Sequence, residues 1–309
     1  MRKRDEFAMN PETWCNLNKP ELSEEKSDIV IFGIPYDKGV SYRGGASEGP
    51  GVLRANTLCS TPYTEQFECM DELNVHDAGD FVGEDRDVLF KEVQDYVAEL
   101  VKKGIFFTMV GGDHSVTIPV EAGVDQGLCE PFGIIHIDAH FDLCDTLGGD
   151  RLSHGSTERR ALELSNIHGS ENLYFVGIRS IEPDEYEFKK NNNVQVKSAK
   201  ECYQEGIEAV AKDVVEKMGR FKKVYITLDI DCLDPAFAAG TGTPQFAGLT
   251  SRQVLTLLEI LFEKLNIIAF DVVEVAPPLD PSLTSMFAAR KIITECWGFQ
   301  AKKWGKLKK

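Results

Sequence analysis

The sequence predicts an α/β protein: a three-layer α/β/α sandwich around a mostly parallel, doubly wound sheet, built as a single domain of residues 1–309. Short runs that are apolar on both faces alternate with stretches of helical periodicity, which is typical of parallel strands joined by helices. The chain contains no linker, repeat or low-complexity tract that would divide it. We expect residues 1–25 to form an N-terminal extension and residues 302–309 a basic, solvated C-terminal tail.

Six apolar runs are the predicted strands of this sheet. They are Ile29–Gly33, Ile105–Val110, Phe132–Ile137, Leu173–Ile178, Val224–Ile230 and Ile267–Val273. Between them, apolar residues recur at three- and four-residue spacing in 89–101 and 207–218, which predicts amphipathic helices. The segment Val254–Leu265 is apolar nearly all round and predicts a more deeply buried helix.

Composition and charge restrict the classes of partner. With 42% hydrophobic and 27% charged residues, the chain has the composition of a globular protein with a sizeable core. Its formal net charge of -16 argues against nucleic acid or an anionic membrane as a partner, because both require clustered Lys and Arg. No run approaches the roughly 18 apolar residues of a membrane span, and no signal-peptide core follows Met1–Phe7. The eight cysteines include no Cys-x-x-Cys pair, so we expect a cytoplasmic protein.

Polar clusters follow four of the predicted strands. They are Gly111–Ser115, Asp138–Asp142, Asp229–Pro235 and the pair Asp271 and Glu274. In open α/β sheets, ligands bind beyond the carboxyl ends of the strands, so these clusters are expected to meet there. Each motif alone is usually a turn, a helix cap or a loop, but their joint occurrence after strands favours one shared site.

The residue types in these clusters predict a pair of metal ions. Side chains alternate along a strand, so those of His136, Asp138, His140 and Asp142 share a face while the chain stays extended. Converging buried carboxylates need a cation between them. The expected ligands, too many for one tetrahedral zinc site, are His114, Asp138, His140, Asp142, Asp229 and Asp231. Carboxylates mixed with imidazole suit manganese, and two ions about 3.5–4 Å apart could activate a shared water. We expect His136, which lies earlier in its strand, to be a hydrogen-bonded core histidine.

In this order and at these separations, the motifs resemble the ureohydrolase family, which includes arginases, agmatinases and the guanidino-acid and formiminoglutamate hydrolases. The resemblance extends from Gly33–Gly39 through Arg43–Pro50 to Glu274–Pro277. It implies an arginase-like fold with two Mn²⁺ per subunit. It places His114, Asp138, Asp142 and Asp229 on one ion and Asp138, His140, Asp229 and Asp231 on the other.

The resemblance also implies how the reaction proceeds. A small cationic guanidino substrate would be bound through Glu274 and hydrolysed to urea and an amine. His154, in Ser153–Gly155, corresponds to the proton shuttle, and Asp142 is the second group able to protonate the departing amine. Asp234, in the same motif as Asp231, would hold the ligands in place without binding metal itself. Members of the family usually form trimers or hexamers, so a homo-oligomer is expected.

Residues away from the metal motifs carry the prediction of the substrate. Arginases hold the amino-acid head group with polar residues where this chain has Cys144 and Leu152, whereas the segments 177–180 and 240–250 are similar to agmatinases. We therefore predict hydrolysis of agmatine to putrescine and urea. Gln245 replaces the glutamate usual in agmatinases, and Arg151 is a candidate contact for a substrate carboxylate. A guanidino acid such as guanidinobutyrate or guanidinopropionate is thus the alternative, followed by arginine or formiminoglutamate.

Two further classes of function remain open from the sequence. A member of the deacetylase branch of this architecture would use one zinc ion to cleave an amide, but it needs fewer ligands than this chain offers. A catalytically silent paralogue, kept as an assembly partner, would have no need to retain all the motifs together with His154 and Glu274.

Overall fold

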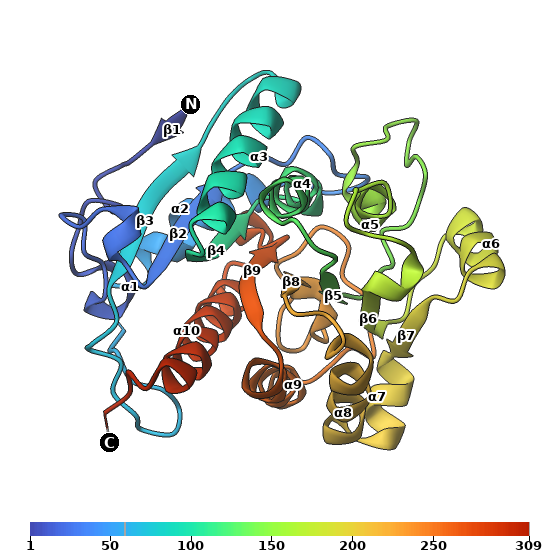
Figure 1. The fold of residues 1–309 in the computed structure, drawn as a ribbon. Coiled ribbons are helices and arrows are strands. Elements are labelled where there is room, and N and C mark those ends of the chain that lie inside the picture. Colours follow the sequence, from blue (N-terminus) through green and yellow to red (C-terminus); the bar gives the residue numbers. More distant parts are fainter. Residues whose placement is uncertain (59, 309) are drawn as a thin grey trace.

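The computed structural model describes residues 1–58 and 60–308 and arranges them around a nine-stranded sheet (Figure 1). The strand order is β1-β3-β2-β4-β9-β8-β5-β6-β7, and neighbouring strands are parallel except for β1, which is antiparallel to β3. The strands are β1 (Arg2–Lys3), β2 (Ile29–Ile34), β3 (Val75–Phe81), β4 (Phe106–Gly111), β5 (Gly133–Ile137), β6 (Leu173–Ile178), β7 (Gln195–Ser198), β8 (Val224–Asp229) and β9 (Ile267–Val273).

Helices cover both faces of the sheet, so the predicted three-layer sandwich is confirmed. In the view of Figure 1, α3, α4 and α5 lie above the sheet, and α7, α8, α9 and α10 lie below it. Alternate side chains of β2 enter the two cores: Ile29 and Ile31 pack on one side, Val30 and Phe32 on the other. The helices are α1 (Thr13–Asn16), α2 (Gly49–Ala55), α3 (Arg86–Lys102), α4 (Thr117–Gly127), α5 (Thr157–Ala161), α6 (Pro183–Asn191), α7 (Ala199–Glu205), α8 (Ile207–Met218), α9 (Ser251–Lys264) and α10 (Thr284–Trp304).

All six predicted strands occur within a residue or two of their expected bounds, but β1, β3 and β7 were missed. Strand β3 is buried although it contains Asp77 and Asp80. The guanidinium of Arg54, in α2, lies 2.7 Å from Asp77 and 2.6 Å from Asp80 and neutralises both carboxylates. Trp14 donates its indole N–H to Asp77 as well. This ion pair joins segments far apart in the sequence, so the local pattern did not indicate a buried strand.

Both ends of the chain contact the domain. Residues 1–25, which we set apart as an extension, include β1 and the side chain of Trp14, which is only 1% exposed. In the expected tail, residues 302–304 continue α10, Lys306 pairs with Asp28, and Lys308 lies 2.9 Å from Asp71. The last tail residue, Lys309, and one of the eight cysteines, Cys59, lie outside the described residues. Among the helices that the structure describes, none is long and apolar enough to cross a bilayer.

Candidate metal centre

The sheet order brings the polar clusters together. Strands β4, β9, β8 and β5 are adjacent, and all four run in the same direction. His114 follows β4, Glu274 follows β9, Asp229 ends β8 and Asp138 follows β5. Because parallel strands present their carboxyl ends at one edge, these four side chains meet there, as the sequence predicted.

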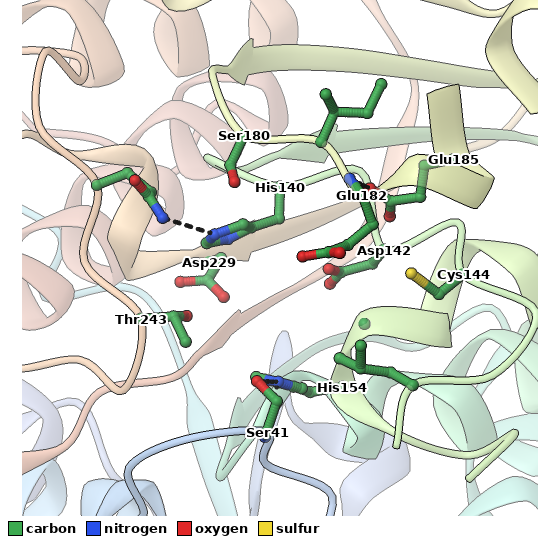
Figure 2. A pocket seen from close by; sticks show the side chains of 14 residues that line it. Ser41, His140, Asp142, Cys144, His154, Ser180, Glu182, Glu185, Asp229 and Thr243 are labelled. Atoms are coloured by element: carbon green, nitrogen blue, oxygen red, sulfur yellow. Dashed lines mark hydrogen bonds between the residues drawn. The ribbon is translucent and has the colours of Figure 1, made fainter. Parts of the chain in front are cut away.

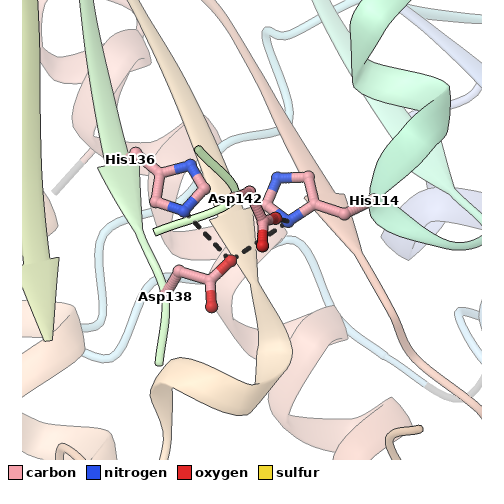
Figure 3. Close-up of side chains that lie close together, drawn as sticks. All are labelled: His114, His136, Asp138 and Asp142. Carbon is pink, nitrogen blue, oxygen red and sulfur yellow. Dashed lines mark ion pairs between the residues drawn. The ribbon is translucent and has the colours of Figure 1, made fainter. Parts of the chain in front are cut away.

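The first group of candidate ligands surrounds one nitrogen of His114. Its Nδ1 lies 3.1 Å from Oδ2 of Asp138, 3.1 Å from Oδ2 of Asp142 and 3.4 Å from Oδ2 of Asp229. Figure 3 shows His114, Asp138 and Asp142 converging in this way. All four side chains are buried. Three carboxylate oxygens thus face one imidazole nitrogen.

The contacts of the other ring nitrogen of His114 show that this nitrogen carries a hydrogen. Its Nε2 lies 2.8 Å from the hydroxyl oxygen of Thr227, and that hydroxyl donates to Oδ1 of Asp271 at 2.7 Å. The hydroxyl hydrogen is therefore used, so the oxygen accepts the N–H of Nε2. Nδ1 therefore faces three carboxylates, and either a proton or a metal ion must lie between it and them. The orphaned Nδ1 and Asp138 Oδ2 thus fit a divalent metal ion.

A second group lies next to the first. Nδ1 of His140 is 3.4 Å from Oδ1 of Asp138 and 3.2 Å from Oδ2 of Asp231. The two oxygens of Asp138 therefore face different groups, as a bridging carboxylate would. Backbone N–H groups fix these side chains: Ala139 donates to Asp231 at 3.1 Å, and Asp231 to Asp229 at 2.7 Å. Among the described residues, Asp229 contacts His114 in the first group but not His140 in the second.

The electrostatics of both groups favour positive charge. Burial alone would lower the pKa of His114, but the contacts with Asp138, Asp142 and Asp229 outweigh burial and raise it well above its ordinary value. Burial likewise opposes charge on His140, yet Asp231 and Asp138 raise its pKa to about 12. Without metal, protons supply the charge that the carboxylates require. The same donor set suits hard divalent ions.

Beside these groups a pocket of about 170 Å³ opens to solvent (Figure 2). His154 lines it, with Nδ1 2.9 Å from Oε1 of Glu274 and Nε2 2.8 Å from the hydroxyl oxygen of Ser41. Burial would lower the pKa of His154, but Glu274 raises it to about 9. Oε2 of Glu274 is buried without a hydrogen-bond partner among the described residues. Both Glu274 and Asp142 have positive φ angles, 63° and 53°, a backbone strain that collects at functional sites.

Only some of the other residues predicted to contact the substrate line the pocket. Arg151 does not line the pocket; its guanidinium lies 2.8 Å from Glu163 and its side chain is 58% exposed, so the expected contact with substrate has no support in its position. Leu152 is also absent from the pocket wall, whereas Cys144 and Gln245 are part of it. Asp234 accepts the N–H of Gly248 at 3.1 Å and thus joins the metal loop to the following loop.

Sequence reasoning missed several pocket residues. Ser41, Ser180, Glu182, Glu185 and Thr243 all line the cavity. Glu182 is the N-cap of α6 and Glu185 lies three residues later, a spacing that is ordinary for a helix cap and carries no signal of a pocket. Ser41 lies between Gly33–Gly39 and Arg43–Pro50, two segments that carry the family resemblance. This position is the only feature of the sequence that pointed to Ser41 as a site residue.

Comparison with known proteins agrees with this geometry. The model of the Arginase family matches residues 27–298. The chain belongs to this family. It is 34% identical to the agmatinase of Bacillus anthracis over 283 residues, covering 90% of this chain and 93% of the relative. It is 31% identical to the guanidinobutyrase of Pseudomonas aeruginosa over 274 residues, or 87% and 85% of the two chains.

A solved structure supports the same assignment. Proclavaminate amidinohydrolase from Streptomyces clavuligerus superposes with a TM-score of 0.84 at 33% identity, covering 94% of this chain and 97% of that one. Members of the Arginase family are metal-dependent amidinohydrolases, so the class of enzyme predicted from the motifs is confirmed. In this member, the clustered side chains of His114, His136, Asp138 and Asp142 could hold a metal ion.

Proposed function

We propose that this chain hydrolyses the guanidino group of agmatine, giving urea and putrescine, with two Mn²⁺ ions held by the groups around His114 and His140. One observation carries the reaction type. The unpartnered Oε2 of Glu274 lies in the same buried site as Nδ1 of His114, which faces three carboxylates. The site thus offers an acceptor for a guanidinium next to ligands for metal.

A divalent ion bound there supplies the Lewis acidity that makes water nucleophilic at neutral pH. The chain's own residues orient the substrate and handle the protons. Oε2 of Glu274 accepts N–H bonds from the guanidinium, and the opposite charges strengthen these bonds. The departing amine needs a proton; the ring of His154, whose pKa is about 9, and the carboxyl of Asp142 are the groups at hand.

The charge of the pocket supports a substrate with a cationic tail. Among the described residues that line it there is no Lys or Arg, whereas Glu182 and Glu185 are part of its wall. Both oxygens of Glu185 accept backbone N–H groups, from Leu143 and Glu182, each at 2.8 Å. In Figure 2 the side chain of Glu182 extends into the cavity beside Asp142. We assign the primary amine of agmatine to this acidic wall, and the similarity to agmatinase supports the assignment.

A guanidino acid is the second candidate. Gln245 lines the pocket where a glutamate is usual in agmatinases, so the wall has one carboxylate fewer than that pattern. The similarity to a guanidinobutyrase points the same way. Urea release from agmatine, guanidinobutyrate, guanidinopropionate, arginine and guanidine decides between them. Agmatine should give the highest kcat/KM, and a preference for guanidinobutyrate would replace it as the substrate.

The identity and number of the metal ions, and the trimeric or hexameric assembly, belong to the same proposal. Metal analysis of protein reconstituted with manganese should give two ions per subunit. A single tightly bound zinc ion that supports activity best would instead favour cleavage of an amide. Light scattering tests the assembly, and a monomer would contradict it.

A further inference from the structure

His136 has no part in the proposed chemistry, although it lies against the metal groups. It belongs to β5, two residues before Asp138, and its side chain is fully buried. Its ring stacks on that of His114, with centroids 5.1 Å apart and planes 3° from parallel. Figure 3 shows it beside His114 and Asp138. Its position near the ligands raises the question whether it binds metal or supports a residue that does.

The partners of its two ring nitrogens answer this question. Nε2 of His136 lies 3.1 Å from the carbonyl oxygen of His140 and 3.1 Å from Oδ2 of Asp138. A carbonyl oxygen can only accept a hydrogen bond, so Nε2 carries a hydrogen. On the other side, Nδ1 is 2.9 Å from Oε1 of Glu158. Whichever of these two atoms holds their shared proton, the hydrogen on Nε2 remains. A metal ligand would need a lone pair on Nε2.

We propose that His136 is a positioning residue of the metal centre, whose Nε2–H holds the carbonyl oxygen of His140 beside Oδ2 of Asp138 while Glu158 fixes the orientation of the imidazole ring. The inference rests on the proposed metal centre and is independent of the substrate. His136 thus agrees with the hydrogen-bonded core histidine expected from the sequence, but with a specific task.

Asp138 is the carboxylate for which such support has the largest effect. Its Oδ2 faces His114 and its Oδ1 faces His140, so a rotation about its side chain would disturb both groups. The backbone N–H of His140 holds Oδ1 at 2.6 Å, and the Nε2–H of His136 holds the carbonyl oxygen of the same His140 while lying 3.1 Å from Oδ2. Partners of this kind orient the ligand before the ion arrives, and their loss typically costs about 10- to 100-fold in metal affinity.

Glu158 connects this support to the catalytic loop. It lies in α5, four residues after His154, and its backbone N–H donates to the carbonyl oxygen of Asp142 at 3.0 Å. Its carboxylate, 0% exposed, reaches back to His136. One short helix therefore contacts both the support of Asp138 and the backbone of Asp142.

Two substitutions of His136 separate a hydrogen bond from packing. The amide nitrogen of His136→Gln reaches the place of Nε2, whereas that of His136→Asn reaches only the place of Nδ1. Both variants lose the ring that stacks on His114, so the packing defect is shared. In calorimetric titration of the chelator-stripped full chain with Mn²⁺, we expect His136→Asn to lower affinity about 10- to 100-fold and His136→Gln by less than about threefold.

Several results would overturn the inference. Equal affinity in both variants, whether as in the wild type or equally reduced, would show that the hydrogen-bond donor at the place of Nε2 is unimportant. The loss of one ion per subunit from the stoichiometry would show that His136 is a ligand. Because the titration needs no turnover, a protein that binds Mn²⁺ as predicted but releases no urea would refute the proposed function alone.

A second pair of variants covers the case in which His136→Asn does not fold without metal. Glu158→Gln keeps an acceptor for Nδ1 of His136, and Glu158→Leu removes it. Thermal unfolding of the metal-free proteins monitors folding. Only Glu158→Leu should weaken Mn²⁺ binding, and an equal effect of the two substitutions would contradict the role of Glu158.

Discussion

Replacing Thr227 by valine tests whether the tautomer of His114 controls metal binding. The hydroxyl of Thr227, 0% exposed, accepts from Nε2 of His114 at 2.8 Å and donates to Asp271 at 2.7 Å. Valine has nearly the same shape but offers no acceptor. In the metal-free variant the ring can give up the proton on Nε2 and keep the one on Nδ1, where three carboxylates accept it. Unfolding of that form should therefore change little, and Asp271 keeps Tyr225 at 2.5 Å as a donor.

Metal binding removes this alternative, because the ion needs the lone pair of Nδ1 and the ring must then carry its hydrogen on Nε2. In Thr227→Val that buried N–H has no acceptor, which costs about 1–3 kcal/mol. The affinity for Mn²⁺ should then fall about 5- to 150-fold, at 1.4 kcal/mol for each factor of ten. Titration calorimetry of stripped protein measures it. Thr227→Ser, which keeps the hydroxyl, is the matched control. Valine and serine variants with the same affinity would refute the argument.

Three further substitutions address other parts of the structure. Glu121→Gln should raise the melting temperature of metal-free protein at pH 8 but not at pH 4. Burial and then Glu158 raise the pKa of Glu121 well above 4.5, so the wild-type protein loses stability as the pH rises past that value. A difference in melting temperature that does not depend on pH would contradict this. Arg179→Lys should lower the free energy of unfolding in urea by about 2–4 kcal/mol. The guanidinium of Arg179 joins two loops by donating to the carbonyl oxygens of Asp231 at 2.7 Å and Gln245 at 2.8 Å, and a lysine cannot reach both. An unchanged urea midpoint would contradict this role of Arg179. Glu182→Gln should raise KM for agmatine about two- to fivefold with kcat unchanged, and leave guanidinobutyrate unaffected; equal effects on both substrates would remove Glu182 from the tail site.

The sheet and the convergence of the metal motifs could be predicted because both follow from local patterns. Central parallel strands are apolar on both faces, and their carboxyl ends meet at one edge, so the residues after β4, β5 and β8 had to lie together. Predicting which residues lie at that edge did not require the strand order. The assignment of individual ligands to individual ions stays a prediction.

What the sequence could not show depends on partners distant along the chain. Strand β3 was missed because Arg54, more than twenty residues away, neutralises its carboxylates. The role of His136 depends on Glu158, whose helix follows a separate loop. Arg151 was placed near the substrate by its closeness to His154 in sequence, but its loop directs the guanidinium to Glu163. Spacing along the chain carries no information about such contacts.

The most direct test of the central claim is urea release from agmatine by the chelator-stripped full chain, with and without added Mn²⁺, beside Asp231→Asn. Asp231 belongs to the group around His140, so its amide variant should fold but bind less metal. We predict urea and putrescine in equal amounts, dependent on Mn²⁺ and abolished in the variant. Manganese-loaded wild type that releases no urea from agmatine or from any other guanidino compound of the panel would contradict the account.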